Sequence, residues 1–398
     1  MKKPRSHVHD LRGASRLAIE ATKRVTDLVE AMHMTIGSGP AILGRPLEGP
    51  TRLATGLVYG GIRGVADWVG VGIDRALAEL GGVLGQSAPG PEREAVLAAL
   101  NGVLGDYLSE TGNPLAIDMS LGRAGIGLEL ERAAIHRALP DASGRLVVLV
   151  HGSCMHAGQW ERRGHDHGTA LAKSLGKTCV YLQYNSGLHI STNGRAFSEL
   201  LERLVAEWPT PLEELTLIGH SMGGLVARAA CHVAESSGHR WRTQLGAMVC
   251  LGSPHHGAPL ERGGNWIDVL LGATPYSAPL ARLGKIRSAG VTDLRHGNVL
   301  DEHWQGHDRF ALQADPRARL ELPAGVRCYA IAGTTTKEPA EKLLGDGLVP
   351  VDSALGRHPQ RELSLEFPDA HQLVAFETGH LDLLDSREVY AAVESFLS

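Results

Sequence analysis

Residues 215–230 read LTLIGHSMGGLVARAA, and this stretch decides the fold. Its first four residues form a mostly apolar, β-favouring run, and its last six have the composition of a helix. Between the two parts, Gly219 and Gly223 flank Ser221, each two residues away from it. A Gly-x-Ser-x-Gly turn between a strand and a helix holds its serine in strained geometry and exposes the hydroxyl. The pattern predicts a nucleophile at Ser221; the alternative is a glycine-rich turn that merely contains a serine.

Length, charge and cysteine content narrow the class of protein. A chain of 398 residues has room for one large α/β domain with an accessory segment, or for two domains. Its formal net charge of -5 is small, its basic residues are scattered and its aromatic content is only 5%, so no nucleic-acid partner is expected. Five cysteines without metal-type spacing predict buried thiols in a reducing compartment.

The N-terminal part carries no pattern typical of export or of a membrane span. The basic start at residues 1–5 is followed by more charged residues and not by a continuous apolar core. The weakly charged stretch 51–85 is interrupted by charged residues at positions 63, 67, 74, 75 and 79, which argues against a spanning helix. A cytoplasmic location is therefore predicted.

Helical periodicity dominates the first third of the chain, at residues 11–36, 58–80 and 92–110. These segments predict a helical N-terminal extension over residues 1–114. The stripe at 58–80 is amphipathic, so the alternative is a helix that contacts a membrane surface, a lipid surface or a partner protein.

From residue 115 onward, candidate strands alternate with helices. An antiparallel hairpin is expected first, and most of the later strands are separated by helical segments; the candidates are 116–121, 126–130, 146–150, 178–184, 215–220, 248–251, 326–332 and 362–367. This order predicts an α/β fold with a mostly parallel, doubly wound sheet over residues 115–398.

A serine nucleophile requires a histidine base and an acid, and both follow Ser221 in the chain. His380 precedes a helix that is expected to begin near Ser386, where an open sheet presents loops at its carboxyl edge. Asp346 lies between two glycines, which leave room for its carboxylate to meet an imidazole. Asp352 and Asp382 are the other nearby acids; the first lies too far into the next segment, and the second suits a loop support.

Acyl transfer also needs amide donors for the developing oxyanion. The backbone N–H of Met222 comes with the serine turn, and a second donor is expected in the loop that follows the strand 146–150. Ser153 is the predicted second donor, through its backbone N–H, and Cys154 is the alternative.

About seventy residues between Gly257 and Val326 exceed an ordinary connection, and they predict a lid over residues 258–325. Its apolar residues, among them Trp266, Leu270 and Tyr276, are expected to contact an acyl chain together with Cys154. The adjacent histidines His255 and His256 invite a metal interpretation, but no ligand-bearing helix motif accompanies them, so no catalytic metal is expected. Without a dinucleotide or phosphate-loop motif, no organic cofactor is expected either.

The order of these motifs resembles the α/β-hydrolase superfamily, and within it the bacterial lipases and esterases. The resemblance covers residues 115–398 and includes Gly-Ser-Pro-His-His-Gly at 252–257 and Gly-Asp-Gly-Leu-Val-Pro at 345–350. In triacylglycerol lipases a segment similar to the first leads into the lid region, and one similar to the second carries the triad acid, which supports Asp346. The first 110 residues have no counterpart in this resemblance.

These expectations together describe a serine carboxylic-ester hydrolase with the triad Ser221, His380 and Asp346, acting on hydrophobic esters. Acyl transfer and the hydrolysis of amides, thioesters or polyesters use the same triad and remain open. An alternative of another class is a non-catalytic α/β scaffold that binds a partner or a membrane through its N-terminal helices. The oligomeric state is not predicted.

Overall fold

The computed structural model describes residues 91–123, 125–258, 288–307, 317–337 and 345–398, together with Gly13 and Arg16. By its contacts the chain divides into two compact units. One comprises residues 1–90 and 108–116, and the other comprises residues 91–107 and 117–398. The sequence predicts a boundary between two domains, residues 1–114 and 115–398, and this boundary stays a prediction.

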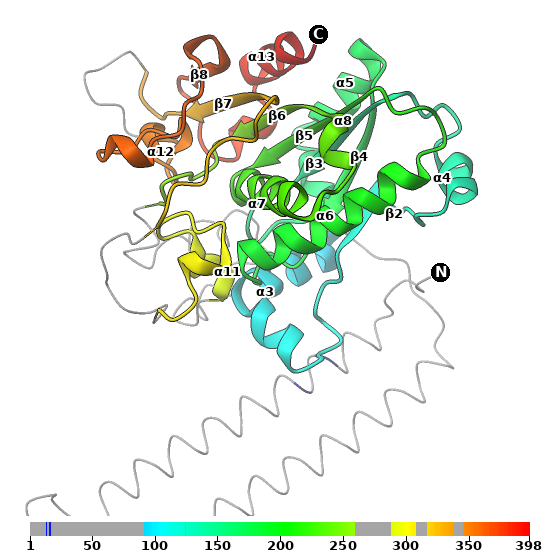
Figure 1. The fold of residues 1–398 in the computed structure, drawn as a ribbon, viewed down its shortest axis with the longest axis horizontal. Coiled ribbons are helices and arrows are strands. Elements are labelled where there is room, and N and C mark those ends of the chain that lie inside the picture. The colour runs from blue at the N-terminus through cyan, green and yellow to red at the C-terminus, as the bar shows by residue number, and fades with distance from the viewer. Residues whose placement is uncertain are drawn as a thin grey trace, which may run out of the picture. The chain divides into compact units, whose positions relative to one another are not determined.

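The larger unit is built around a mixed sheet. In the described residues its eight strands lie in the order β2-β1-β4-β3-β5-β6-β7-β8 (Figure 1). Only the pairs β1–β2 and β1–β4 are antiparallel, and the others are parallel. The strands are β1 (Ser120–Arg123), β2 (Ile126–Gly127), β3 (Arg145–Val150), β4 (Thr178–Gln183), β5 (Glu214–His220), β6 (Leu245–Leu251), β7 (Arg327–Gly333) and β8 (Gln372–Ala375). The predicted α/β sheet, with its initial antiparallel pair, is confirmed.

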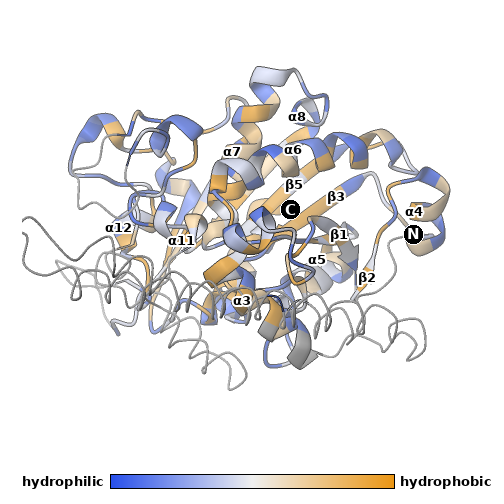
Figure 2. Cartoon of the chain, turned by 90° about the horizontal axis from the view of Figure 1, so that it is seen from below, coloured by the Kyte–Doolittle hydropathy of each residue, from blue (hydrophilic) through white to orange (hydrophobic). Residues whose placement is uncertain are grey.

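Helices cover both faces of this sheet (Figure 1). The longer ones are α3 (Pro91–Glu110), α4 (Arg132–Ala138), α5 (His167–Leu175), α6 (Ile190–Glu207), α7 (Met222–Ser237) and α13 (Arg387–Leu397). The shorter ones are α8 (Trp241–Gln244), α11 (Ala289–Asp293), α12 (Val351–Ala354), η2 (Ala157–Trp160), η4 (Asp301–His303), η5 (Arg361–Leu363), η6 (Asp369–His371) and η7 (Asp382–Leu384). Because both faces are covered, the central strands are apolar at nearly every position, as Figure 2 shows for β3 and β5.

Alternate residues of each strand contribute to different layers. Val147, Leu149 and Ile218 face a buried cluster that includes Leu171 of α5 and Val389 of α13. The helix α13 begins where the sequence predicts, because the Ser386 side chain accepts a hydrogen bond from the Val389 backbone N–H and caps the first turn.

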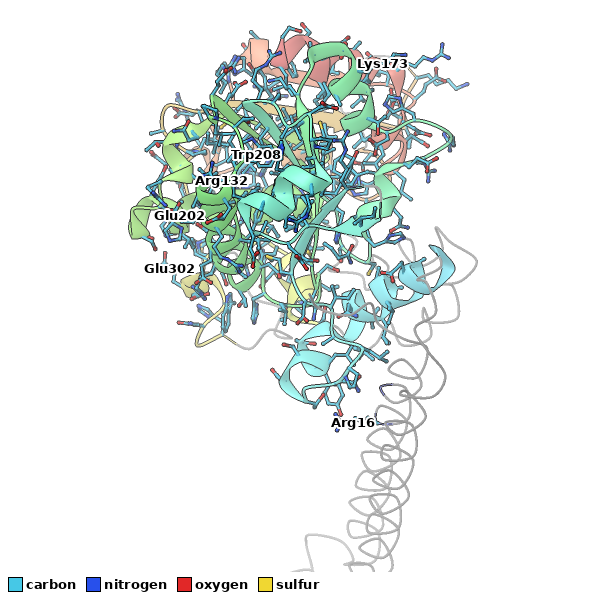
Figure 3. The ribbon with its side chains drawn as sticks, turned by 90° about the vertical axis from the view of Figure 1, so that its right-hand side faces the viewer. Arg16, Arg132, Lys173, Glu202, Trp208 and Glu302 are labelled. Atoms are coloured by element: carbon cyan, nitrogen blue, oxygen red, sulfur yellow. The ribbon has the colours of Figure 1, made fainter. Side chains whose placement is uncertain are left out.

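The helix α6 also supports the loops at the opposite end of the strands. Trp208, which ends α6, is buried and donates from its indole nitrogen to the Ser143 carbonyl at 3.0 Å. Arg132 of α4 donates to the Ala206 carbonyl at 3.0 Å, so these two side chains connect α4, α6 and the start of β3 (Figure 3).

One predicted strand is wrong. Residues 362–367 alternate apolar and polar side chains, yet they form the end of η5 and an irregular segment. Leu365 donates its backbone N–H to the Gly356 carbonyl at 2.8 Å, and its side chain and Phe367 pack on the turn at Gly356. The last strand is β8, which begins ten residues later than predicted and pairs Gln372 with Ala330.

Burial lowers the pKa of several histidines in this unit. In the described residues they are His151, His156, His167, His220, His255 and His256. His167 shows the cause. Its imidazole is buried at the start of α5, its Nε2 lies 2.9 Å from the Leu383 carbonyl, and burial lowers its pKa to about 4. Such a side chain is neutral in the folded protein and takes up a proton when the chain unfolds in mild acid.

We predict that the free energy of unfolding falls as the pH drops from about 6.5 toward 4. A histidine with a lowered pKa in the folded state contributes its full stability above 6.5, and the unfolded chain binds the extra proton below that value. Each such histidine adds a slope approaching ~1.4 kcal/mol per pH unit. Urea unfolding at pH 7, 6 and 5 measures the total slope.

The matched pair His167→Gln and His136→Gln isolates one contribution. His136 is exposed on α4, so its replacement should leave the slope unchanged, whereas His167→Gln should reduce it by roughly 1 kcal/mol per pH unit. Equal slopes in the two variants would contradict the assignment of a neutral, buried His167.

Candidate active site

Ser221 occupies the sharp turn between β5 and α7. Its backbone angles, φ 55° and ψ −123°, lie in a region that a residue with a side chain rarely adopts. A Cβ atom at Gly219 would collide with the backbone of Gly224, and one at Gly223 would collide with the Val150 carbonyl at the end of β3. The two glycines therefore allow the turn to be this tight, and the helix α7 starts directly against β3.

His380 and Asp346 meet on the loops that follow β8 and β7. The Nδ1 atom of His380 lies 2.7 Å from Oδ2 of Asp346, and both side chains are buried. The second carboxylate oxygen of Asp346 accepts the backbone N–H groups of Leu348 at 3.0 Å and Val349 at 2.8 Å. With the carboxylate fixed in this way, Nδ1 of His380 carries the proton, and Nε2 is the basic nitrogen of the neutral ring.

The two other acids considered from the sequence lie elsewhere. The Asp352 side chain is 76% exposed and lies 3.9 Å from Arg357, while Asp382 forms an ion pair with Arg163 at 3.0 Å. Among the three acids, Asp346 is therefore the one for which the structure gives a hydrogen bond to His380.

His220 connects the serine turn to the histidine loop. Its Nε2 lies 3.0 Å from the His380 carbonyl oxygen, and the centroids of the two imidazoles are 4.8 Å apart. A carbonyl only accepts, so Nε2 of His220 carries a proton and donates it. Burial keeps the pKa of His220 well below its ordinary value, so this neutral tautomer persists in the folded protein.

The loop after β3 lies against the same turn. A Cβ atom on Gly152 would be 3.0 Å from Cβ of Ser221, so this glycine permits the close approach. The backbone N–H of Cys154 donates to Oγ of Ser186 at 3.0 Å and is not available to a substrate. Within the described residues, no hydrogen bond involves the backbone N–H of Ser153 or of Met222. The geometry therefore favours Ser153 over Cys154 as the second oxyanion donor.

The helix α3 approaches the loop after β3 closely, a contact that the sequence did not predict. A Cβ on Gly102 would collide with the Cys154 side chain, and a Cβ on Gly105 would collide with Asn185 in the loop after β4. The Asn185 amide nitrogen donates to the Gly105 carbonyl at 2.8 Å. The spacing of Gly102 and Gly105, three residues apart on one helical face, was the available signal for this close packing.

Side chains missed by sequence reasoning also hold the loop that follows His380. His167 donates to the Leu383 carbonyl, and Arg163 pairs with Asp382 at 3.0 Å and with Asp385 at 3.4 Å. No sequence motif marks these residues, because their partners are more than 200 positions away in the chain. By contrast, His220 was visible inside the Gly-His-Ser motif.

The remaining predicted site residues have separate outcomes. Trp266, Leu270 and Tyr276 lie outside the described residues. All five cysteines are free and buried, and burial raises the pKa of Cys154 to about 11, so its thiol is protonated at neutral pH. Within the ranges the structure describes, no three His, Cys, Asp or Glu side chains gather as a metal site, and no helix is long and apolar enough to cross a membrane.

Comparison with known proteins adds a family and several solved structures. Residues 141–316 match the family described as a PGAP1-like alpha/beta domain. No curated protein matches the chain. Similar solved structures include the mature Bacillus licheniformis lipase BlEst2, with 16% identity, a TM-score of 0.42 and coverage of 64% of this chain and 92% of the lipase.

Two further structures are an Aspergillus fumigatus lipase and a Bacillus subtilis esterase. The Aspergillus fumigatus lipase B is 14% identical over 62% of this chain, with a TM-score of 0.38, and the match covers 51% of that lipase. The Bacillus subtilis naproxen esterase is 14% identical over 64% of this chain, with a TM-score of 0.36, and the match covers 84% of that esterase. Residues 141–316 are therefore similar to the PGAP1-like alpha/beta domain family, and the described residues form an α/β fold with a mostly parallel mixed sheet.

Proposed function

We propose that the protein is a serine carboxylic-ester hydrolase. The observation that carries the proposal is the buried His380–Asp346 hydrogen bond beside a serine held at positive φ. A histidine that is oriented by a carboxylate can activate the hydroxyl of a serine at such a turn for attack on a carbonyl, and in this structure Ser221 itself is buried.

In the proposed reaction, Nε2 of His380 removes the hydroxyl proton as Oγ of Ser221 attacks the ester carbonyl. The amides of Met222 and Ser153 donate to the oxyanion of the tetrahedral intermediate, and Asp346 stabilises the imidazolium. His380 then protonates the departing alcohol. Water that is deprotonated by the same histidine attacks the acyl-enzyme, releases the carboxylic acid and restores Ser221.

The proposed substrates are hydrophobic esters, because the predicted lid segment 258–325 is rich in apolar residues. The same acyl-enzyme would also serve acyl transfer or the hydrolysis of amides, thioesters or polyesters, and product analysis separates these reactions. The proposal involves no metal or organic cofactor. We further propose that residues 1–114 form a helical extension of the catalytic part, with peripheral lipid contact as one role.

Ser221→Ala should lower kcat by roughly 10⁵-fold or more while the fold is retained, because the hydroxyl acts in chemistry and not in packing. Labelling by a fluorophosphonate probe should disappear together with esterase activity. Ser236→Ala is the matched control, since Ser236 is an exposed serine near the end of the same helix. Unchanged labelling in Ser221→Ala would contradict the proposed mechanism.

Asp346→Asn should lower kcat by roughly 10⁴-fold, because the carboxylate orients the histidine base.

A series of p-nitrophenyl esters tests the substrate class. If the apolar lid segment receives the acyl chain, kcat/KM should rise from acetate to octanoate by about tenfold or more, since each buried CH₂ contributes about 0.8 kcal/mol at most. A preference for acetate would contradict the hydrophobic-ester part of the proposal while leaving the serine mechanism intact.

His220 is expected to act as a positioning residue for the base. His220→Leu removes the donor to the His380 carbonyl, and we expect kcat to fall by roughly 10- to 100-fold with little change in KM. His220→Gln places an amide N–H near the Nε2 position and should restore most of the activity. Similar kcat values for wild type and His220→Leu, measured with one ester, would show that this hydrogen bond does not position the base.

A further inference from the structure

Arg228 is a buried cation without a carboxylate partner. It lies two turns after Ser221 on α7 and is only 4% exposed. In the part of the chain that the structure describes, no Asp or Glu side chain pairs with its guanidinium. Burial lowers its pKa to about 10, so the side chain stays charged at neutral pH. A buried charge without an opposite charge is costly, which makes Arg228 a site that favours an anion.

The hydrogen bonds of Arg228 leave donors unused. Nη2 donates to the Leu320 carbonyl at 2.6 Å, and Nη1 lies 3.3 Å from Nδ1 of His255. A guanidinium only donates, so Nδ1 of His255 accepts and its Nε2 carries the proton. Within the described residues, Nε of Arg228 and Nε2 of His255 are buried without a hydrogen-bond partner. Both atoms are donors that lack an acceptor.

These two residues line a pocket that contains further arginines. Its empty space is about 280 Å³, part of it open to solvent, and Arg317 and Arg319 also line it. None of the residues that line it is acidic. The nearest carboxylates to Arg319, those of Glu321 and Glu366, lie 3.7 and 3.6 Å away and are 78% and 84% exposed, so they neutralise it weakly.

We propose that this pocket binds a phosphoryl group through Arg228, Arg319 and His255. A phosphate monoester carries about two negative charges at neutral pH and three acceptor oxygens, which suit several cations and unused donors. A carboxylate carries a single charge and would leave more of the positive charge uncompensated. Guanidinium groups in particular match phosphate oxygens with paired N–H donors.

The pocket lies on the loop that also supports the candidate active site. His255 belongs to residues 252–257, and a Cβ on Gly252 at the start of this loop would be 3.1 Å from Oδ2 of Asp346 and 3.3 Å from Nδ1 of His380. The phosphoryl group would thus be bound by a segment whose other end touches the acid and the base. The binding proposal does not depend on ester hydrolysis.

Calorimetric titration of the full chain with inorganic phosphate and with glycerol 3-phosphate tests the pocket, with sodium acetate and sodium chloride compared at matched ionic strength. We expect saturable binding of both phosphates and no comparable binding of acetate or chloride. Arg228→Met, which keeps the length of the side chain and removes the charge, should raise the Kd at least ~10-fold. Arg240→Gln is the control, because Arg240 is 75% exposed and pairs with Glu202 away from the pocket.

Arg319→Gln tests the same pocket if Arg228→Met does not fold, since its side chain is 26% exposed and removes no core packing. This variant should raise the Kd for phosphate several-fold.

Vesicles that contain phosphatidic acid, compared with vesicles of phosphatidylcholine alone, show whether the bound phosphoryl group comes from a lipid or from a soluble compound. Binding that glycerol 3-phosphate displaces would assign the phosphoryl group to a lipid head, and phosphate binding without vesicle binding would assign it to a soluble ligand. Phosphate affinity equal to that for acetate, or unchanged in both pocket variants, would overturn the proposal.

Discussion

The close approach between the serine turn and the end of β3 is the constraint on which the site depends. The start of α7 can lie against the Val150 carbonyl only because Gly223 has no side chain. The strand β3 pairs with β4 on one side and with β5 on the other, so the chain runs from β3 to β4 and then crosses back over β3 to β5. Open α/β sheets place their sites at such a reversal, outside the carboxyl ends of the strands, and both Ser221 and the Gly152 loop lie at this end.

Neutral histidines join the loops at this end of the sheet. His220 donates to the backbone of the His380 loop, and His167 donates to the same loop three residues further on. His151 stacks on Tyr184 with ring centroids 4.3 Å apart, and burial lowers its pKa to about 3. A neutral imidazole supplies a directed donor without the solvation cost of a buried charge. The loops are thus held by hydrogen bonds from imidazoles that burial keeps neutral.

The sequence identified the parts of the fold with strong local signals. The strand–turn–helix around Ser221, the short apolar strand at 146–150 and the capped helix after Ser386 all lie where predicted, because each has its own pattern. The prediction of the last strand at 362–367 was wrong, because Leu363, Leu365 and Phe367 alternate with polar residues as they would in a strand. Leu365 and Phe367 instead pack on a turn, which satisfies the same alternation. The contact between α3 and the loop after β3 depends on residues about fifty positions apart, Gly102 and Cys154, which no local pattern records.

Within the candidate site, the residue types and their order were predictable, and the geometry was not. Asp346 and Asp352 differ little in sequence context, yet one accepts two backbone amides and meets His380 while the other faces solvent. The two backbone amides and His380 give the buried carboxylate of Asp346 its hydrogen-bond donors. Arg228 is the opposite case, because it is buried with a carbonyl and an imidazole for partners and, within the described residues, no carboxylate pairs with it. Its donors at Nε and at Nε2 of the neighbouring His255 lack acceptors, and this is the reason to look for an anion there.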